Sequence, residues 1–189
     1  RTPALEVDAR QTNAKTTQRF PDLNFEFTPP EAGWIKLHAA SISPDAEVAY
    51  TSKAPQVIFF IIAEQVGADA DVKLDALLEV VKSNLYASFD EVEFEQSVAQ
   101  TISGVEGLSI KATYVQGAVQ QRRAIWIGAR GGYLYQVISS GRAKHSEQLD
   151  SRHDEMLAGF HVIDGDAVVY SGGQTPITRY ESEHYGYEV

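Results

Sequence analysis

Histidine is the side chain best suited to metal binding and to proton transfer near neutral pH, and the 189-residue chain has five of them. Three, His145, His153 and His161, recur every eight residues. On a helix, eight residues rotate a side chain by about 80° beyond two whole turns, so these three side chains would diverge. No His-x-x-x-His pair and no cysteine is present. The sequence therefore predicts neither a metal site nor a bound cofactor.

The motifs of nucleophilic catalysis and of phosphate binding are also missing. The chain has no Gly-x-Ser-x-Gly elbow and no Ser-x-x-Lys pair. The glycines at 128–132 lie between two predicted strands, whereas a phosphate loop needs a helix behind it. We therefore expect a protein that is not an enzyme. The alternative is an enzyme or a small-ligand-binding protein with a site assembled from dispersed residues, for which His153, Asp154 and Glu155 are the candidates.

The charged residues are distributed unevenly along the chain. The 26 acidic residues outnumber the 16 lysines and arginines, and the resulting net charge of −10 argues against a nucleic-acid partner. Residues 64–95 contain nine acids and two lysines, but residues 107–146 contain no acid and six lysines or arginines. This contrast predicts a basic surface formed by the second stretch.

Aromatic residues accompany the arginines in this basic stretch. Arginine together with tryptophan and tyrosine is typical of interaction hot spots. We therefore hypothesise a partner-binding surface with its guanidinium groups exposed near the aromatic rings, formed by Arg122, Arg123, Trp126, Arg130, Tyr135 and Arg142. The alternative is that the rings belong to the core and that the arginines pair within the chain, with Glu91, Glu93 or Glu95.

Alternating and continuous apolar runs predict the strands of the fold. The two longest predicted strands after residue 107 are joined by Gly131-Gly132, which suits a two-residue hairpin turn because glycine tolerates positive φ. We expect all strands to form one mainly antiparallel sheet. They are predicted at 23–27, 34–37, 48–51, 56–63, 92–96, 108–115, 122–130 and 133–140.

Two helices are predicted between and after these strands. Leucines and valines at helical spacing over 74–85 form one apolar stripe, and Asp69 or Asp71 can cap the helix that carries it. A second helix is expected at 146–158, with Ser146 as its N-cap and Gly159 ending it. The order of strands, helix, four strands and helix indicates an α+β fold, in which an antiparallel sheet is packed between helices.

Three segments of the chain differ in composition. Residues 1–19 are predicted to be a polar N-terminal arm, 20–163 the folded domain, and 164–189 a tyrosine-rich C-terminal extension. No run approaches the roughly 18 apolar residues of a transmembrane helix. Removal of a leader or lipid-anchor segment would produce a polar start of this kind, and so would trimming of a longer chain. We therefore expect a periplasmic or extracellular protein, while a cytoplasmic location stays open.

Short motifs in the domain resemble those of PsbP-like proteins, which are related to an extrinsic subunit of photosystem II. They are Phe25-Glu26-Phe27-Thr28-Pro29-Pro30, Gly33-Trp34-Ile35-Lys36, Ile102-Ser103-Gly104 before a long strand, and a last helix ending at Gly159-Phe160. The resemblance covers residues 20–163 and implies a PsbP-like α+β sandwich. It also implies a non-catalytic binding or adaptor domain, exported or lipid-anchored, that docks a protein partner.

Overall fold

The computed structural model describes residues 16–68 and 72–169. Both predicted caps of the first helix, Asp69 and Asp71, lie outside this part of the chain. So do most of the predicted N-terminal arm and all four tyrosines of the C-terminal extension.

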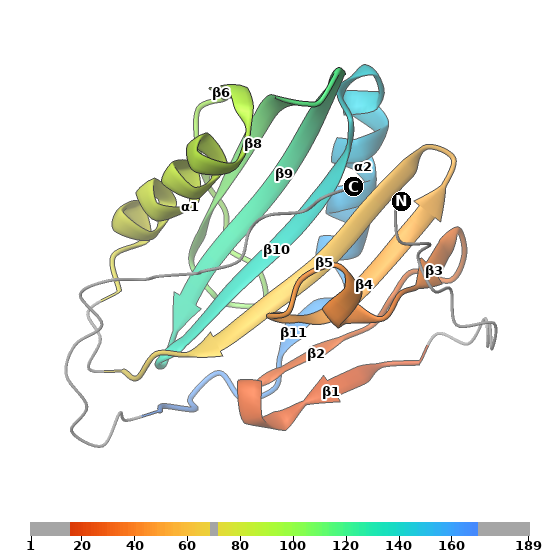
Figure 1. Ribbon diagram of the computed structural model, residues 1–189. Helices are drawn as coiled ribbons and strands as arrows, with labels where there is room; N and C mark the ends of the chain where they lie inside the picture. Colours follow the sequence, from red (N-terminus) through yellow and green to blue (C-terminus); the bar gives the residue numbers. More distant parts are fainter. Residues whose placement is uncertain (1–15, 69–71, 170–189) are drawn as a thin grey trace.

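The larger of two sheets has eight strands, which all pair in antiparallel fashion. They are β3 (Trp34–Lys36), β4 (Ala46–Lys53), β5 (Gln56–Gln65), β6 (Asp90–Phe94), β7 (Val98–Ala99), β8 (Gly107–Gln116), β9 (Val119–Arg130) and β10 (Tyr133–Arg142). Their order is β3-β4-β5-β10-β9-β8-β6 (Figure 1), and β7 also pairs with β8. This arrangement confirms the predicted fold class.

The long β9–β10 hairpin forms the centre of this sheet. Its turn is made by Gly131 and Gly132, both at positive φ (61° and 85°), as the sequence predicts. Residues at even positions of β9 face one side of the sheet and residues at odd positions face the other, because successive side chains of a strand alternate. This alternation separates the neighbouring arginines Arg122 and Arg123.

The two helices cover opposite faces of the sheet (Figure 1). Helix α1 (Leu74–Ser88) buries its predicted apolar stripe on the face that carries Ile125 and Ile127. Helix α2 (Ser146–Leu157) packs on the other face, against the side of β9 that carries Ala124 and Trp126. No described helix has the length and apolar character needed to cross a membrane.

Both ends of α2 differ from the prediction in detail. The N-cap is His145 instead of Ser146, and the side chain of His145 makes no capping hydrogen bond. A short 3-10 turn (Ala143–His145) leads directly into the helix, so Ser146 already has helical dihedral angles. At the other end, the helix stops at Leu157, one residue before the predicted end, and Gly159 follows its C-cap. The backbone of Thr28 lies too close to Gly159 for a side chain at this position. A Cβ atom at Gly159 would lie 2.1 Å from the carbonyl oxygen of Thr28.

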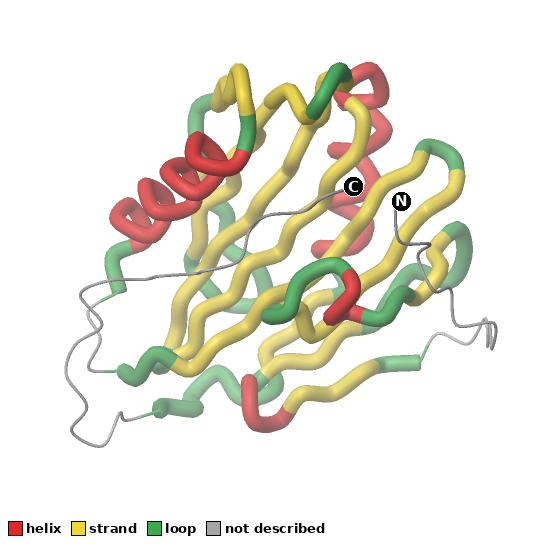
Figure 2. The backbone as a smooth tube through the Cα atoms, in the orientation of Figure 1, coloured by secondary structure: helices red, strands yellow, loops and turns green. Residues whose placement is uncertain are grey.

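A second, three-stranded sheet corrects the prediction that all strands share one sheet. It has the order β1-β2-β11, from β1 (Gln18–Phe20), β2 (Phe25–Phe27) and β11 (Phe160–Val162). The strands are short and lie below the large sheet in Figure 2. Phe25 and Phe27 are fully buried in the same core cluster as Trp126. This sheet therefore helps α2 to cover one face of the large sheet.

The polar segment before residue 20 takes part in the second sheet. Gln18 and Arg19 belong to β1, although the sequence places them in the arm. The side-chain amide of Gln18 donates a hydrogen bond of 2.8 Å to the hydroxyl of Tyr50 on β4, and Arg19 forms an ion pair with Glu26. Hydrogen bonds and one ion pair thus hold a segment that lacks an apolar pattern. Two further 3-10 turns, Pro21–Leu23 and Ala39–Ser41, complete the described elements.

Candidate functional site

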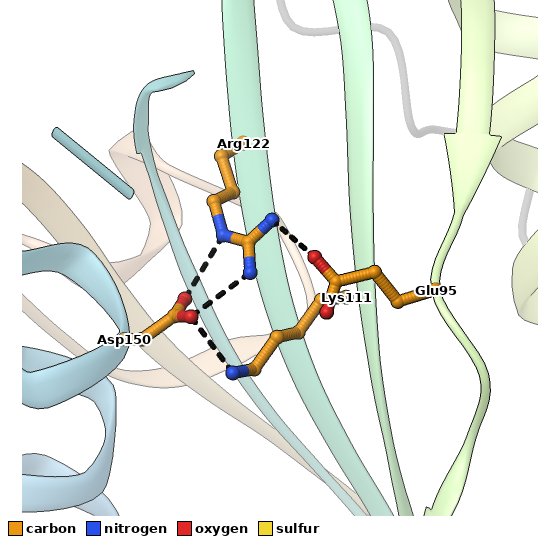
Figure 3. Close-up of polar contacts among 4 residues, drawn as sticks. All are labelled: Glu95, Lys111, Arg122 and Asp150. Carbon is orange, nitrogen blue, oxygen red and sulfur yellow. Dashed lines mark hydrogen bonds and ion pairs between the residues drawn. The ribbon is translucent and has the colours of Figure 1, made fainter. Parts of the chain in front are cut away.

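Arg122 lies at the centre of an ion-pair network between the large sheet and α2 (Figure 3). Its Nε and Nη2 donate to the two carboxylate oxygens of Asp150 on α2, at 3.0 and 2.9 Å. Its Nη1 donates to Glu95 at 2.7 Å, and Lys111 on β8 donates to Asp150, also at 2.7 Å. The side chain of Arg122 is 9% exposed, whereas that of Glu95 is 55% exposed. The network therefore fastens α2 to β8 and β9.

The pKa values in this network show which form of each group the fold stabilises. Burial by itself would raise the pKa of the Asp150 carboxyl, but hydrogen bonds from Arg122 and Lys111 outweigh it, so that the pKa is lowered. The hydrogen bond with Asp150 is the main reason that the pKa of Arg122 is raised. The charged forms of both partners are thus stabilised, as expected for groups that hold the fold together.

Arg123 points to the opposite face of the sheet and is also buried. Its Nε donates to the hydroxyl of Ser140 at 2.9 Å. The guanidinium carbon lies 5.4 Å from the ring centres of Phe89 and Tyr114. Cation–π contacts of this kind stabilise a buried guanidinium group, and within the described part of the chain Arg123 forms no ion pair. Arg123 therefore belongs to the packing around α1.

The two aromatic residues of the hypothesised surface lie in the core. Trp126 is 0% and Tyr135 is 1% exposed. The indole Nε1 of Trp126 donates a hydrogen bond of 3.0 Å to the carbonyl oxygen of Gln100. The hydroxyl of Tyr135 donates one of 3.2 Å to the carbonyl oxygen of Leu23. Burial raises the pKa of Tyr135. Each ring thus has an internal partner for its polar group.

Arg130 and Arg142 are exposed, but they lie at opposite ends of the hairpin. Arg130 pairs with Tyr133 beside the turn, and Arg142 pairs with Gln121 at the far end. Nine steps along β9 separate these positions, or roughly 30 Å at about 3.3 Å per residue. Arg130 also donates to the carbonyl oxygen of Gly104 at 2.8 Å. The two arginines therefore do not belong to one patch.

The expectation that the four guanidinium groups lie at the surface near Trp126 or Tyr135 is thus wrong for Arg122 and Arg123. The alternative, pairing inside the chain, describes Arg122 in part, because Glu95 is one of its partners. Its second partner, Asp150, was missed because it comes from a helix on which the sequence shows only an ordinary polar position. No pattern in the sequence singles it out.

His153, the first of the catalytic candidates, is buried between α2 and the sheet. Its Nδ1 shares a hydrogen bond of 2.9 Å with the hydroxyl of Ser139, which is itself fully buried. Its Nε2 has no hydrogen-bond partner among the residues that the structure describes. Asp154 and Glu155 are exposed, and Glu155 forms an ion pair with Arg152. The structure therefore separates the three candidates instead of bringing them together.

The burial of His153 predicts a loss of stability in acid. Burial lowers the pKa of His153 from 6.5 to about 4, so a proton binds the unfolded chain more readily than the folded one. The contribution of neutral His153 is complete above pH 6.5 and is lost as the pH falls towards 4. It amounts to roughly 3 kcal/mol in the free energy of unfolding.

Urea unfolding of wild type and His153→Asn at pH 7 and pH 4 measures this contribution, because asparagine does not titrate. The wild type should lose roughly 3 kcal/mol more than the variant between the two pH values. Equal losses would show that His153 is protonated without cost in the folded protein.

The other two histidines of the eight-residue series lie apart from His153. His145 is the half-buried N-cap of α2, and His161 is exposed on β11. Within residues 16–68 and 72–169, no three histidine, aspartate or glutamate side chains gather in an arrangement that could hold a metal ion.

Comparison with known proteins places the fold. No family model matches the sequence, and no curated protein sequence does. Among solved structures, the cyanobacterial PsbP of Synechocystis superposes with a TM-score of 0.60 at 15% identity, over 82% of this chain and 95% of that one. LpqN of Mycobacterium tuberculosis superposes with a TM-score of 0.56 at 11% identity, over 73% of this chain and 82% of LpqN. The Ran-binding protein Mog1p of Saccharomyces cerevisiae superposes with a TM-score of 0.52 at 12% identity, over 80% of this chain and 97% of Mog1p.

These neighbours share the α+β sandwich described above, with an antiparallel sheet between helices. The chain is a PsbP-like domain in its fold, as the motifs in its sequence imply. At 11–15% identity the likeness concerns the fold alone.

Proposed function

We propose that this chain is a non-catalytic binding domain that docks a protein partner. The proposal rests on the observation that buried groups capable of acid–base chemistry contact one another inside the domain. The histidine and serine that could do acid–base chemistry, His153 and Ser139, are buried against each other. The buried charges of Arg122 and Asp150 hold α2 on the sheet. An enzyme needs several such groups converging on an accessible site.

The names of the structural neighbours support the same class of function. Mog1p is a Ran-binding protein, and it therefore has a protein partner. LpqN is involved in cell envelope biogenesis, which supports our proposal that this chain is exported or lipid-anchored. Fractionation of the cells that produce the protein tests the location. We expect it in the periplasmic or extracellular fraction, and its presence in the cytoplasm alone would contradict the export part of the proposal.

Of the hypothesised basic surface, Arg130 and Arg142 remain candidates for partner contacts because both are exposed. Their separation means that a small partner would contact one of them and not both. The buried members of the set would influence a partner only through the stability of the domain.

Affinity capture tests the proposed function. The folded chain is immobilised, exposed to an extract of its own organism, and compared with an unrelated protein of similar size and net charge. We expect one protein to be retained only by the chain, and to bind it again when both are purified. Failure to retain any protein above the control would contradict the proposal.

A further inference from the structure

The outer edge of the large sheet beside α1 is formed by β6 and β7. Both strands pair with β8 on their inner side, and neither pairs with another described strand. The amide of Glu95 donates to the carbonyl oxygen of Lys111 on β8. Because hydrogen bonds alternate along an antiparallel ladder, the amide and carbonyl of the preceding residue, Phe94, point outward. The edge therefore offers free backbone groups to an added strand.

The same edge carries acidic side chains without counter-ions. Asp90, Glu91 and Glu93 are exposed, and none of them forms an ion pair within the described residues. Their neighbour Glu95, by contrast, pairs with the buried Arg122. Glu93 lies opposite Thr113, which in turn lies opposite Arg122. Glu93 therefore projects on the α2 side of the sheet, where Glu95 also reaches Arg122. A partner strand with basic side chains on this side would complement both carboxylates.

Aromatic side chains lie on the other side of this edge. Tyr86 of α1 is 60% exposed, although it is a large apolar residue. Its ring meets that of Phe94 edge to face, with 5.2 Å between centroids. The ammonium group of Lys82 lies 6.0 Å from the centre of the Phe94 ring, and Glu79 pairs with this lysine. A partner strand with apolar side chains on the α1 side would cover Tyr86 and Phe94.

We propose that the β6–β7 edge binds an extended segment of a protein partner in which basic and apolar residues alternate. The segment adds to the sheet as a strand, with its basic side chains towards Glu93 and Glu95 and its apolar ones towards Tyr86 and Phe94. This inference rests on the proposed function and names the chemistry of the partner. Acidic edges also occur where proteins keep an edge from pairing at all. In that case removal of the acids would cause self-association.

A synthetic heptapeptide, Lys-Val-Lys-Val-Lys-Val-Lys with blocked ends, is a suitable probe. Its binding to the intact chain is measured by calorimetry, and the exchange of backbone amides by NMR. The test variant is Asp90→Asn/Glu91→Gln/Glu93→Gln. A matched control, Asp45→Asn/Glu147→Gln/Asp154→Asn, removes the same charge from exposed positions elsewhere. A peptide with N-methylated valines tests the backbone contacts.

We expect the test variant to bind the peptide about tenfold more weakly and the control to bind it about as well as wild type. Raising the salt from about 50 to about 300 mM should weaken binding, and N-methylation should abolish it. The amide of Phe94 should exchange more slowly in the complex.

Several results would overturn the inference. They are equal binding by the test variant and wild type, protection of amides elsewhere on the sheet, and self-association of the test variant without peptide binding by wild type. Absence of peptide binding would overturn this inference alone, because affinity capture of a natural partner tests the proposed function separately.

Discussion

Replacement of Arg122 by alanine is expected to lower the free energy of unfolding by about 3 kcal/mol. The reason is that Asp150 would keep a partly buried charge with Lys111 as its remaining partner, and removal of one member of a buried pair usually costs more than the pair contributes. Glu95 loses little, because its side chain is 55% exposed. Urea unfolding at pH 7 measures the effect.

The matched control for this prediction is Arg142→Ala. Arg142 comes from the same hairpin but is exposed, so its replacement should change the free energy of unfolding by less than about 0.5 kcal/mol. Equal effects of the two variants would show that the network of Figure 3 contributes nothing to stability.

Replacement of Trp126 by alanine should cost about 3–5 kcal/mol, as for other large buried aromatic residues. The indole is fully buried and lies directly against the backbone of two glycines. A Cβ atom at Gly107 or at Gly128 would lie 2.6 Å from the ring. The backbone around the cavity cannot collapse easily, because the strands that hold both glycines are paired on each side.

Tyr86→Ala serves as the comparison, since it removes an aromatic ring that is 60% exposed. We expect a cost below about 1 kcal/mol from urea unfolding. If Trp126→Ala were equally mild, the indole would have to be accessible to solvent, and its place in a binding surface would be open again.

Local patterns predicted most of the large sheet and both helices. The stripe over 74–85 identified the buried face of α1, and Gly131-Gly132 identified the hairpin turn. These features depend on neighbours in the sequence, so spacing and residue type are sufficient to find them. The extents of β9 and β10 were underestimated by two or three residues, because the missed residues are mostly polar and show no apolar alternation, although they pair in the ladder.

Sequence patterns did not predict that a second sheet forms. It joins strands of three residues from the two ends of the described chain, with Phe160 opposite Phe27. The alternation over 23–27 predicted β2, but β1 and β11 show no such period, and the polar Gln18 and Arg19 give no apolar signal. Their pairing is decided by which surface α2 leaves uncovered, and this is a property of the assembled core.

The lack of acidic residues over 107–146 was recognised in the sequence, but the exposed basic surface expected from it did not include Arg122 and Arg123. A run without acids suggests an exposed basic surface only if the acids that balance it are absent in space as well. Asp150 lies 28 residues after Arg122 and reaches it because α2 crosses the face of β9. The alternation of β9 also sends Arg122 and Arg123 to different faces. Residue types were therefore informative, while the partners depended on the packing of α2.

We propose that the two buried arginines of the hairpin, Arg122 and Arg123, hold the fold, while a partner docks on the β6–β7 edge. Hydrogen exchange of the chain, alone and in complex with the protein retained in affinity capture, tests this claim most directly. We predict slower exchange of amides in β6 and β7, above all that of Phe94. Protection around Arg130 and Arg142, with β6 and β7 unchanged, would contradict the claim.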